Sequence, residues 1–345
     1  MNAPAPELSV VIPVYNEEAG LQRLFERLYP ALDRLGRSFE VIFVDDGSRD
    51  RSAALLKDEY LKRPAETRVI VFNANYGQHL AIVAGFELAR GDRVVTLDAD
   101  LQNPPEEIAR LVAAMDAGAD YVGTIRVSRQ DVLWRKAASR FLNRVREGTT
   151  SIQITDQGCM LRGYHRNVID AVNRCSEVST YVPALAYTFA RHPVEIEVAH
   201  AERTVGQSKY SLFRLIRLNF DLMTGFSVAP LQFFSMSGIV IALLSIIFVI
   251  YLAIRRLVVG PEAEGVFTLF GIAFFLIGVA LIGLGVVGEY VGRIYEQVRQ
   301  RPRYTVAAVL EQGGRDEPAQ LAQSSPPESR PAQLPAPERV RGTVE

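Results

Sequence analysis

Two carboxylates, two residues apart, follow a short apolar run in the N-terminal half of the chain. The run covers residues 94–97, Asp98 and Asp100 follow it, and Asn103-Pro104-Pro105 prevents its continuation. Alternate side chains of an extended segment point to the same side, so both carboxylates can face one ligand. Carboxylate oxygens suit a hard divalent cation, and such a cation can hold a diphosphate. A turn with Asx-type capping is the alternative interpretation.

The residues around this run alternate between strand and helix patterns. We expect strands at residues 8–14, 40–44, 68–72 and 93–97, and helices at residues 21–32, 52–60 and 78–90. Such an alternation predicts an α/β domain with a mostly parallel, Rossmann-like sheet that is covered on both faces. In sheets of this kind, ligands bind beyond the carboxyl ends of the strands.

The predicted carboxyl ends of three strands are rich in acidic side chains. These residues are Glu17, Asp45, Asp46, Asp98 and Asp100. Like charges at one sheet edge repel each other unless a cation or hydrogen-bond donors are present. No GxxxxGK[ST] or GxGxxG sequence follows any of the strands, so we expect a metal and basic side chains to hold a diphosphate. For residues 45–48, a plain turn is the alternative to a base or ribose contact.

Two segments supply positive charge. Residues 126–146 contain seven basic residues and one acidic residue, and their apolar residues recur at helical spacing. We expect a basic amphipathic helix at the membrane surface, and a solvated helix packed on the core is the alternative. Residues 202–210 contain Gly206 between Arg203 and Lys209, which predicts a mobile basic loop that closes over a diphosphate. A solvated loop is the alternative there.

The length and composition of the chain allow a second structural part in addition to one soluble domain. The chain has 345 residues, 48% of them hydrophobic, and a formal net charge of -1. Its two cysteines, Cys159 and Cys175, form neither a disulfide framework nor a metal-ligand spacing, which fits a reducing compartment. We expect no signal peptide, because residues 1–7 are polar and proline-rich.

Two uncharged segments, residues 231–254 and 266–288, are long enough to span a bilayer, since about 20 apolar residues suffice. Two buried helices of a soluble protein are the alternative. The loop at residues 255–264 holds two arginines and two glutamates, whereas the outer flanks are richer in base. The distribution of basic residues therefore predicts that both termini are cytoplasmic and that this loop is outside.

Several motifs at these positions resemble those of family 2 glycosyltransferases with the GT-A fold. The motifs are Val11-Ile12-Pro13-Val14-Tyr15-Asn16-Glu17, Val44-Asp45-Asp46-Gly47-Ser48, Asn75-Tyr76-Gly77-Gln78-His79 and Leu97-Asp98-Ala99-Asp100-Leu101-Gln102-Asn103-Pro104-Pro105. Residues 156–162, 206–211 and 288–295 extend the similarity to polyprenyl-phosphate glycosyltransferases with two C-terminal membrane spans. Within this group, the chain is most similar to bacterial enzymes that transfer 4-deoxy-4-formamido-L-arabinose to undecaprenyl phosphate in lipid A modification.

The resemblance implies a set of site residues. The catalytic residues are Asp98, Asp100 and Asp156, and Asp98 and Asp100 also hold Mg²⁺ or Mn²⁺. The donor-binding residues are Pro13, Tyr15, Glu17, Asp45, Asp46, Gln102, Arg203 and Lys209, although which of the adjacent aspartates meets the base is open. The acceptor phosphate is bound by Arg126, Arg135 and Ser139. For Asp156, a capping role in a turn is the alternative to orienting the acceptor or assisting proton transfer.

The expected reaction is inverting transfer of a sugar from a UDP-sugar to undecaprenyl phosphate on the cytoplasmic face of the bacterial inner membrane. A phosphate monoester has a second pKa of about 6 and is mostly dianionic at neutral pH, so it needs no general base. Orientation and charge neutralisation should therefore dominate. Transfer of glucose or another hexose is one alternative, and a non-catalytic membrane adaptor that binds nucleotide-sugar is another. We expect membrane lipid but no nucleic acid as a partner, and the resemblance implies a homotetramer.

We expect five parts in the chain. They are a cytoplasmic GT-A catalytic domain at residues 1–210, an interfacial helix at 211–230, a two-helix transmembrane hairpin at 231–290, a cytoplasmic juxtamembrane segment at 291–310 and a disordered tail at 311–345. The tail is rich in Pro, Gln, Ala and Ser, and it has too few large apolar residues to offset its ordering entropy.

Overall fold

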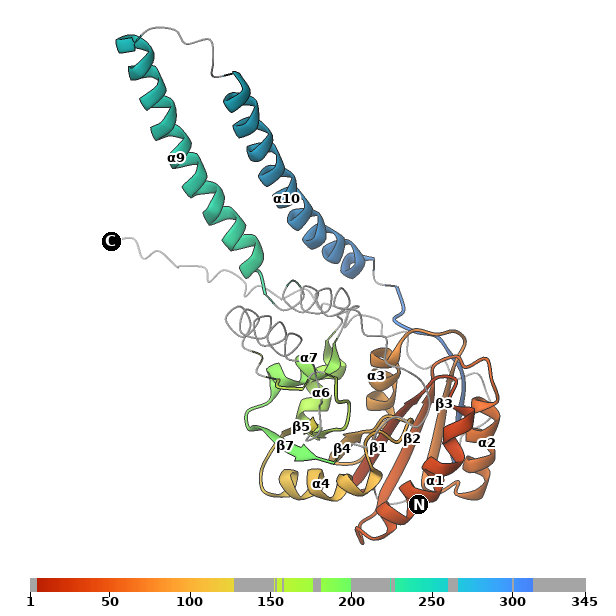
Figure 1. The fold of residues 1–345 in the computed structure, drawn as a ribbon. Helices are drawn as coiled ribbons and strands as arrows, with labels where there is room; N and C mark the ends of the chain where they lie inside the picture. The colour runs from red at the N-terminus through yellow and green to blue at the C-terminus, as the bar shows by residue number, and fades with distance from the viewer. Residues whose placement is uncertain are drawn as a thin grey trace, which may run out of the picture.

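A mixed eight-stranded sheet forms the centre of the soluble part (Figure 1). The computed structural model describes residues 5–126, 152, 154–156, 158–175, 181–199, 224, 227–259, 266–299 and 301–312. The strands are β1 (Leu8–Val14), β2 (Phe39–Asp45), β3 (Thr67–Phe72), β4 (Arg93–Thr96), β5 (Tyr121–Arg126), β6 (Arg162–His165), β7 (Pro193–Val198) and β8 (Val306–Leu310). Their order is β7-β5-β6-β4-β1-β2-β3-β8.

The four strands nearest the N-terminus are parallel, as predicted. β1 lies between β2 and β4, and β3 pairs with β2. Their carboxyl ends therefore meet at one edge of the sheet. β6 runs antiparallel between β4 and β5, and β8 runs antiparallel to β3, so the complete sheet is mixed.

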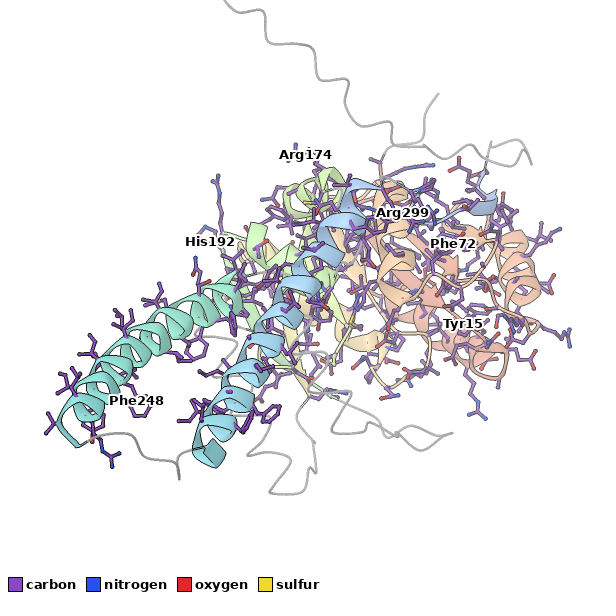
Figure 2. All side chains as sticks on the ribbon, turned by 90° about the horizontal axis from the view of Figure 1, so that it is seen from above. Tyr15, Phe72, Arg174, His192, Phe248 and Arg299 are labelled. Atoms are coloured by element: carbon purple, nitrogen blue, oxygen red, sulfur yellow. The ribbon has the colours of Figure 1, made fainter. Side chains whose placement is uncertain are left out.

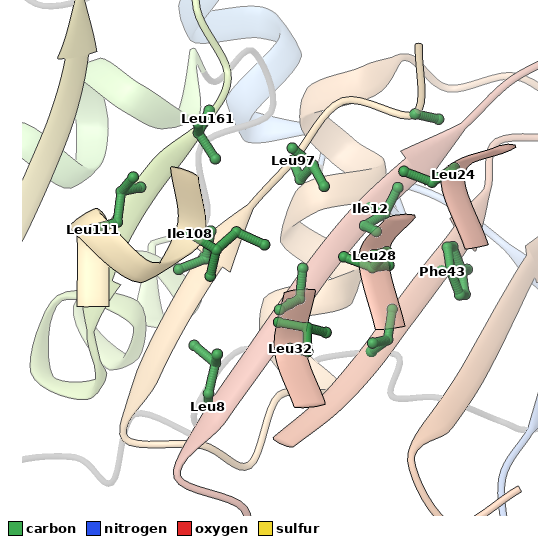
Figure 3. Close-up of a cluster of buried hydrophobic side chains, with 14 of the residues drawn as sticks. Leu8, Ile12, Leu24, Leu28, Leu32, Phe43, Leu97, Ile108, Leu111 and Leu161 are labelled. Atoms are coloured by element: carbon green, nitrogen blue, oxygen red, sulfur yellow. The ribbon is translucent and has the colours of Figure 1, made fainter. Parts of the chain in front are cut away.

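Helices cover both faces of the sheet. They are α1 (Glu18–Asp33), α2 (Ser52–Lys62), α3 (Gln78–Leu88), α4 (Ile108–Asp116), which follows the short 3-10 helix η1 (Pro105–Glu107), α6 (Arg166–Arg174) and α7 (Val182–Phe189). The buried side chains of α1, α2 and α4 pack with Leu8 and Ile12 of β1 on one face (Figure 3). Those of α3, α6 and α7 pack with Val11 on the other face. Strand β1 is thus buried on both sides, which explains its continuous apolar sequence.

A strand that we did not predict closes one edge of the sheet. Residues 291–310, expected to be only a juxtamembrane segment, contain the end of a long helix and then β8, which pairs with β3. The Tyr304 ring stacks on Phe72 with 4.8 Å between centroids, and its hydroxyl donates to Glu87 over 2.6 Å. Glu311 accepts a hydrogen bond from Arg68 at 2.6 Å. The chain after the long helix therefore belongs to the sheet domain.

Two long apolar helices, α9 (Ala229–Val259) and α10 (Val266–Val298), project away from the sheet domain (Figures 1 and 2). Phe248 of α9 lies far along the hairpin, whereas Tyr15 lies on the sheet domain (Figure 2). By length and composition, residues 229–248 and 272–298 could each cross a membrane, with mean hydropathies of 2.2 and 2.3 and at most 6% of the residues buried. The Tyr290 hydroxyl donates to the carbonyl of Ser227 at 2.7 Å and ties the two helices together near the domain.

Candidate active site

The structure brings the acidic residues at the carboxyl ends of β1, β2 and β4 to one edge of the sheet. The charges of Asp100, Arg126 and Glu17 all act on the carboxyl group of Asp98. The backbone fixes the position of Asp98, because the Leu97 amide donates to the carbonyl of Val11 at 3.1 Å and continues the pairing of β4 with β1.

Two glutamines contact the carboxylate pair. Gln78 Nε2 donates to Asp98 Oδ1 at 2.6 Å. Asp100 accepts from the backbone amide of Gln102 at 3.1 Å and from its side-chain Nε2 at 2.5 Å. The backbone contact is an Asx-type turn, and Leu101 adopts a positive φ of 59° within it. The turn that we considered as an alternative is therefore present together with the carboxylate pair.

The protonation of Asp98 is perturbed. Burial raises its pKa to about 7, with a further contribution from the neighbouring Asp100 charge. The amide of Gln78 and the charge of Arg126 act in the opposite direction. Two carboxylates in this situation fit a hard divalent cation, which would relieve their repulsion. Across the described parts of the chain, no group of three or more His, Cys, Asp or Glu side chains forms a complete metal site.

The adjacent aspartates at the end of β2 differ in their partners. Asp46 accepts hydrogen bonds from the amides of Tyr76 and Gly77 at 2.7 and 2.9 Å, and from Asn75 Nδ2 at 3.0 Å. Asp45 accepts a long bond of 3.3 Å from the Ser48 amide on Oδ2 and a hydrogen bond from the Ser48 side chain, and its buried Oδ1 has no partner within the described residues. Burial raises the pKa of both carboxyl groups.

The turn between β1 and α1 is tied to the turn between β2 and α2. The amides of Asn16 and Glu17 donate to the hydroxyls of Ser48 and Ser52, each at 2.9 Å. Pro13 is buried inside β1, and Glu17 is half-buried. The Tyr15 ring, in contrast, is 42% exposed at the same sheet edge, so it is accessible to a planar ligand.

The predicted acceptor residue Arg126 and the predicted catalytic residue Asp156 form a bidentate ion pair. Arg126 Nε and Nη2 lie 2.6 and 2.8 Å from the two Asp156 carboxylate oxygens, and both side chains are mostly buried. The pair raises the pKa of Arg126. Asp156 also accepts from the Gly158 amide at 3.1 Å, so its capping role in a turn is present as well.

Arg162 stabilises the turn that contains Asp156 and Gly158. Its guanidinium is fully buried and donates to the carbonyls of Cys159 and Asp156 at 2.9 and 2.7 Å. It also contacts the Tyr121 hydroxyl. Sequence reasoning included Arg162 in a motif but gave it no role, because nothing in the sequence shows which carbonyls a buried arginine meets.

Four predicted residues fall outside the described part of the chain. They are Arg135, Ser139, Arg203 and Lys209. Most of the two predicted interfacial helices also falls there, apart from Arg126 at the start of the first and residues 224 and 227–230 of the second. The structure adds Gln78, which sequence reasoning missed. Its position in the motif at residues 75–79, after the carboxyl end of a predicted parallel strand, was the available signal, since ligands bind beyond those strand ends.

Comparison with known proteins identifies the class. Residues 9–172 match the family model described as Glycosyl transferase family 2. The chain is 51% identical over 311 residues to the undecaprenyl-phosphate 4-deoxy-4-formamido-L-arabinose transferase of Klebsiella pneumoniae subsp. pneumoniae, covering 90% of this chain and 95% of that protein. The chain therefore belongs to glycosyl transferase family 2: it is a glycosyltransferase, and its mixed α/β sheet is of the GT-A type.

A second relative agrees with this class. A protein of the same name from Edwardsiella ictaluri is 50% identical over 312 residues, covering 90% of this chain and 96% of that protein. Among solved structures, glucosyl-3-phosphoglycerate synthase from Mycobacterium tuberculosis, in complex with Mn²⁺, UDP-glucose and phosphoglyceric acid, is 15% identical with a TM-score of 0.44. That comparison covers 64% of this chain and 78% of the synthase.

Proposed function

We propose that this glycosyltransferase moves 4-deoxy-4-formamido-L-arabinose from a UDP-sugar to undecaprenyl phosphate, with inversion at the anomeric carbon. The identity of about half the residues over 90% of the chain with transferases of that name supports the sugar and the acceptor. The observation that carries the chemistry is that β4 and β5 both pair antiparallel with β6, so the Asp98–Asp100 pair after β4 and the Arg126–Asp156 pair at the end of β5 lie at the same edge of the sheet. One site thus combines acidic oxygens for a cation with a held guanidinium for a phosphate.

The carboxylate pair is the donor half of this site. Asp98 and Asp100 hold Mg²⁺ or Mn²⁺ together with the diphosphate of the donor, and Gln102 keeps Asp100 in place through two hydrogen bonds. When bound, the cation stabilises the negative charge that develops on the departing UDP.

The nucleoside is bound by the ends of β1 and β2. Asp45 makes the base or ribose contact, because its buried Oδ1 lacks a donor that a uracil N–H or a ribose hydroxyl can supply. Asp46 is already occupied by the loop at residues 75–77. The exposed Tyr15 ring packs against the base, with Pro13 and Glu17 forming the floor and side of the pocket.

The acceptor half is built around Arg126. Asp156 binds the Nε and Nη2 side of its guanidinium and fixes its orientation, so the Nη1 side is the one offered to a phosphate, and Arg135 and Ser139 complete the acceptor site. One phosphate oxygen of the dianionic acceptor attacks the anomeric carbon while the bond from that carbon to UDP breaks. Arg203 and Lys209 close over the diphosphate and offset the charge of two anions in one site.

The apolar hairpin holds the sheet domain at the membrane, where the lipid acceptor lies. In our proposal α9 and α10 span the inner membrane, with the sheet domain and both termini in the cytoplasm and residues 255–264 outside. β8 begins beside Phe72 at the carboxyl end of β3, so the chain leaving α10 reaches the sheet at its ligand-binding edge. This connection supports a catalytic edge that lies on the membrane side. The homotetramer implied by the resemblance stays a prediction.

Purified full-length protein in detergent tests the proposal. The protein is incubated with undecaprenyl phosphate, Mn²⁺ and a panel of UDP-sugars, and the lipid product is identified by mass spectrometry. We expect lipid-linked 4-deoxy-4-formamido-L-arabinose to form fastest and Asp100→Ala to abolish the product. Faster formation of a hexose product would replace the sugar assignment. Metal-dependent hydrolysis of the donor without any lipid-linked product would contradict the transferase proposal.

A further inference from the structure

Gln78 donates a hydrogen bond to the proposed cation-binding pair, and the proposed function leaves it without a role. It is the first residue of α3, and its Nε2 lies 2.6 Å from Asp98 Oδ1. The Gln78 side chain belongs to α3, whereas Asp98 follows β4. The contact forms because the first residue of α3 lies beside the carboxyl end of β4 in space. A neutral amide in this place can orient a carboxylate without neutralising it and without adding a third negative charge.

The loop before α3 is held in place from β2. Asp46 accepts both backbone amides that immediately precede Gln78, those of Tyr76 and Gly77, and also the Asn75 side chain. Gly77 itself has a positive φ of 97°, which turns the chain into the helix at a conformation that glycine adopts readily. The starting point of α3 is therefore set by the Asp46 carboxylate.

A close backbone contact supports the same loop. Gly47, directly after Asp46, has φ of 69°, and a Cβ at this position would lie 2.4 Å from the carbonyl carbon of Ala74. Only a residue without a side chain lets the end of β2 approach the loop this closely. Three features, at Asp46, Gly47 and Gly77, thus fix the position from which Gln78 reaches Asp98.

We propose that Gln78 is a positioning residue for Asp98, and that Asp46 acts on the cation site indirectly, through the loop and Gln78. The inference rests on the proposed role of Asp98 and Asp100 in holding a divalent cation. The hydrogen bond to Oδ1 restricts rotation of the Asp98 carboxylate and directs Oδ2 toward the cation. Residues that orient a metal ligand in this way commonly change metal affinity by about tenfold to a hundredfold when they are replaced.

The test measures cation binding rather than turnover. Full-length protein in detergent, with UDP present, is titrated with Mn²⁺, and free Mn²⁺ is followed by electron paramagnetic resonance. Gln78→Met keeps the length of the side chain and removes the amide donor. We expect its Mn²⁺ dissociation constant to rise by about tenfold. The matched control is Gln22→Met, an exposed glutamine of α1 that bonds Glu26, and its affinity should equal that of the wild type.

A double-mutant cycle tests the path from Asp46. Asp46→Asn should weaken Mn²⁺ binding in the same direction, and the double variant with Gln78→Met should bind no more weakly than the weaker single variant. Additive losses would overturn the claim that Asp46 acts through Gln78. The melting temperature of the metal-free protein should be unchanged in Gln78→Met, which separates positioning from a folding defect.

The remaining outcomes separate this inference from the proposed function. If the wild type binds no Mn²⁺ in the presence of UDP, the cation site itself is wrong and the role of Gln78 falls with it. If the wild type binds Mn²⁺ and Gln78→Met binds it equally well, only the inference about Gln78 is wrong. Unchanged Mn²⁺ affinity with weaker donor binding would instead place Gln78 against the sugar nucleotide.

Discussion

Asp45 and Asp46 are adjacent, chemically identical and both buried, and only their partners separate their roles. Three donors from one loop occupy Asp46, whereas one oxygen of Asp45 is left for a ligand. The role of Asp156 also follows from its partners. Both of its oxygens accept from Arg126, and one of them also accepts from the Gly158 amide. At the residue scale, the function of a carboxylate here is therefore decided by which hydrogen-bond donors reach it.

The first prediction concerns the nucleoside contact. Asp45→Ala should weaken UDP binding by about tenfold to a hundredfold, because a hydrogen bond to a charged group contributes about 1.5–3 kcal/mol. Isothermal titration calorimetry of UDP with the full-length protein measures the change. Asp58→Ala, on the exposed face of α2, is the control and should leave the affinity unchanged. Equal affinity in both variants would show that Asp45 does not contact the nucleotide.

The second prediction concerns the Arg126–Asp156 pair. Asp156→Ala releases a mostly buried guanidinium, so it should raise the KM for undecaprenyl phosphate and lower turnover, while UDP affinity stays near that of the wild type. Removing one member of a buried pair also destabilises the fold, here by about 3 kcal/mol, the lower end of the usual range. Steady-state kinetics with varied lipid distinguish the two effects. A drop in melting temperature with an unchanged KM for the lipid would show that the pair has only a structural role.

At the element scale, the sheet is completed by β8, a strand that follows the apolar hairpin in the sequence. β8 pairs with β3, and its end is fastened by Glu311, which contacts Arg68 at 2.6 Å and Arg90 at 3.1 Å. Arg68 is buried and also contacts Glu40 at 3.3 Å, so Glu311 completes a network at the opposite end of the sheet from the candidate site. The edge of β3 is thereby paired rather than exposed.

The third prediction tests this attachment. Glu311→Ala should destabilise the sheet domain by about 1.5–3 kcal/mol, because it leaves the buried Arg68 with an unpaired donor. Glu106→Ala removes an exposed partner of Arg27 and should cost less than about 1 kcal/mol. Thermal unfolding of both variants in the same detergent compares the two. A smaller effect for Glu311→Ala than for Glu106→Ala would argue against a structural role for β8.

The fourth prediction concerns the packing of α3 on β1. A Cβ at Gly85 would lie 2.3 Å from Val11 Cγ1, so Gly85→Ala should destabilise the domain by about 1–3 kcal/mol through overpacking. Gly20→Ala in α1 meets only ordinary contacts and should be neutral or stabilising by up to about 1 kcal/mol. The melting temperature should therefore fall in Gly85→Ala, and it should rise or stay unchanged in Gly20→Ala. Equal shifts would show that α3 packs less closely than the structure indicates.

At the scale of the whole molecule, the chain leaves the sheet domain, forms an apolar hairpin and returns to the same sheet. Among the side chains of α9 and α10 that the structure describes, the apolar ones are mostly exposed, and an exposed apolar surface of this length marks a contact with a membrane or with another protein. The return at β8 places the ligand-binding edge near the hairpin. This arrangement favours a reaction between a soluble nucleotide-sugar and a lipid whose phosphate lies at the membrane surface.

The fifth prediction tests the orientation in the membrane. In a variant without Cys159 and Cys175, a cysteine introduced by Gly260→Cys should react with an impermeant maleimide in intact spheroplasts, because the proposed topology puts the hairpin loop outside. A cysteine introduced by Ser324→Cys should react only after lysis, since the same topology puts the C-terminal tail in the cytoplasm. The reverse pattern would invert the proposed topology.

The sequence by itself determined the four parallel strands, the acidic residues at their ends and the two apolar helices. The reason is that strand runs, helical spacing and membrane-length segments are local patterns, and the chain order of strands and helices fixes which strand ends meet. The motif at Asp98 and Asp100 also indicated the family, which the comparisons confirm.

Only the tertiary structure decided the individual partners. The difference between Asp45 and Asp46, the contact of Gln78 with Asp98 and the pairing of β8 with β3 all join residues far apart in the sequence. Hydrogen bonds depend on distances of a few tenths of an ångström between separate elements, and no local pattern encodes those distances. For the carboxylate pair, the sequence indicated a cation site, and the structure showed that the Gln78 side chain contacts Asp98.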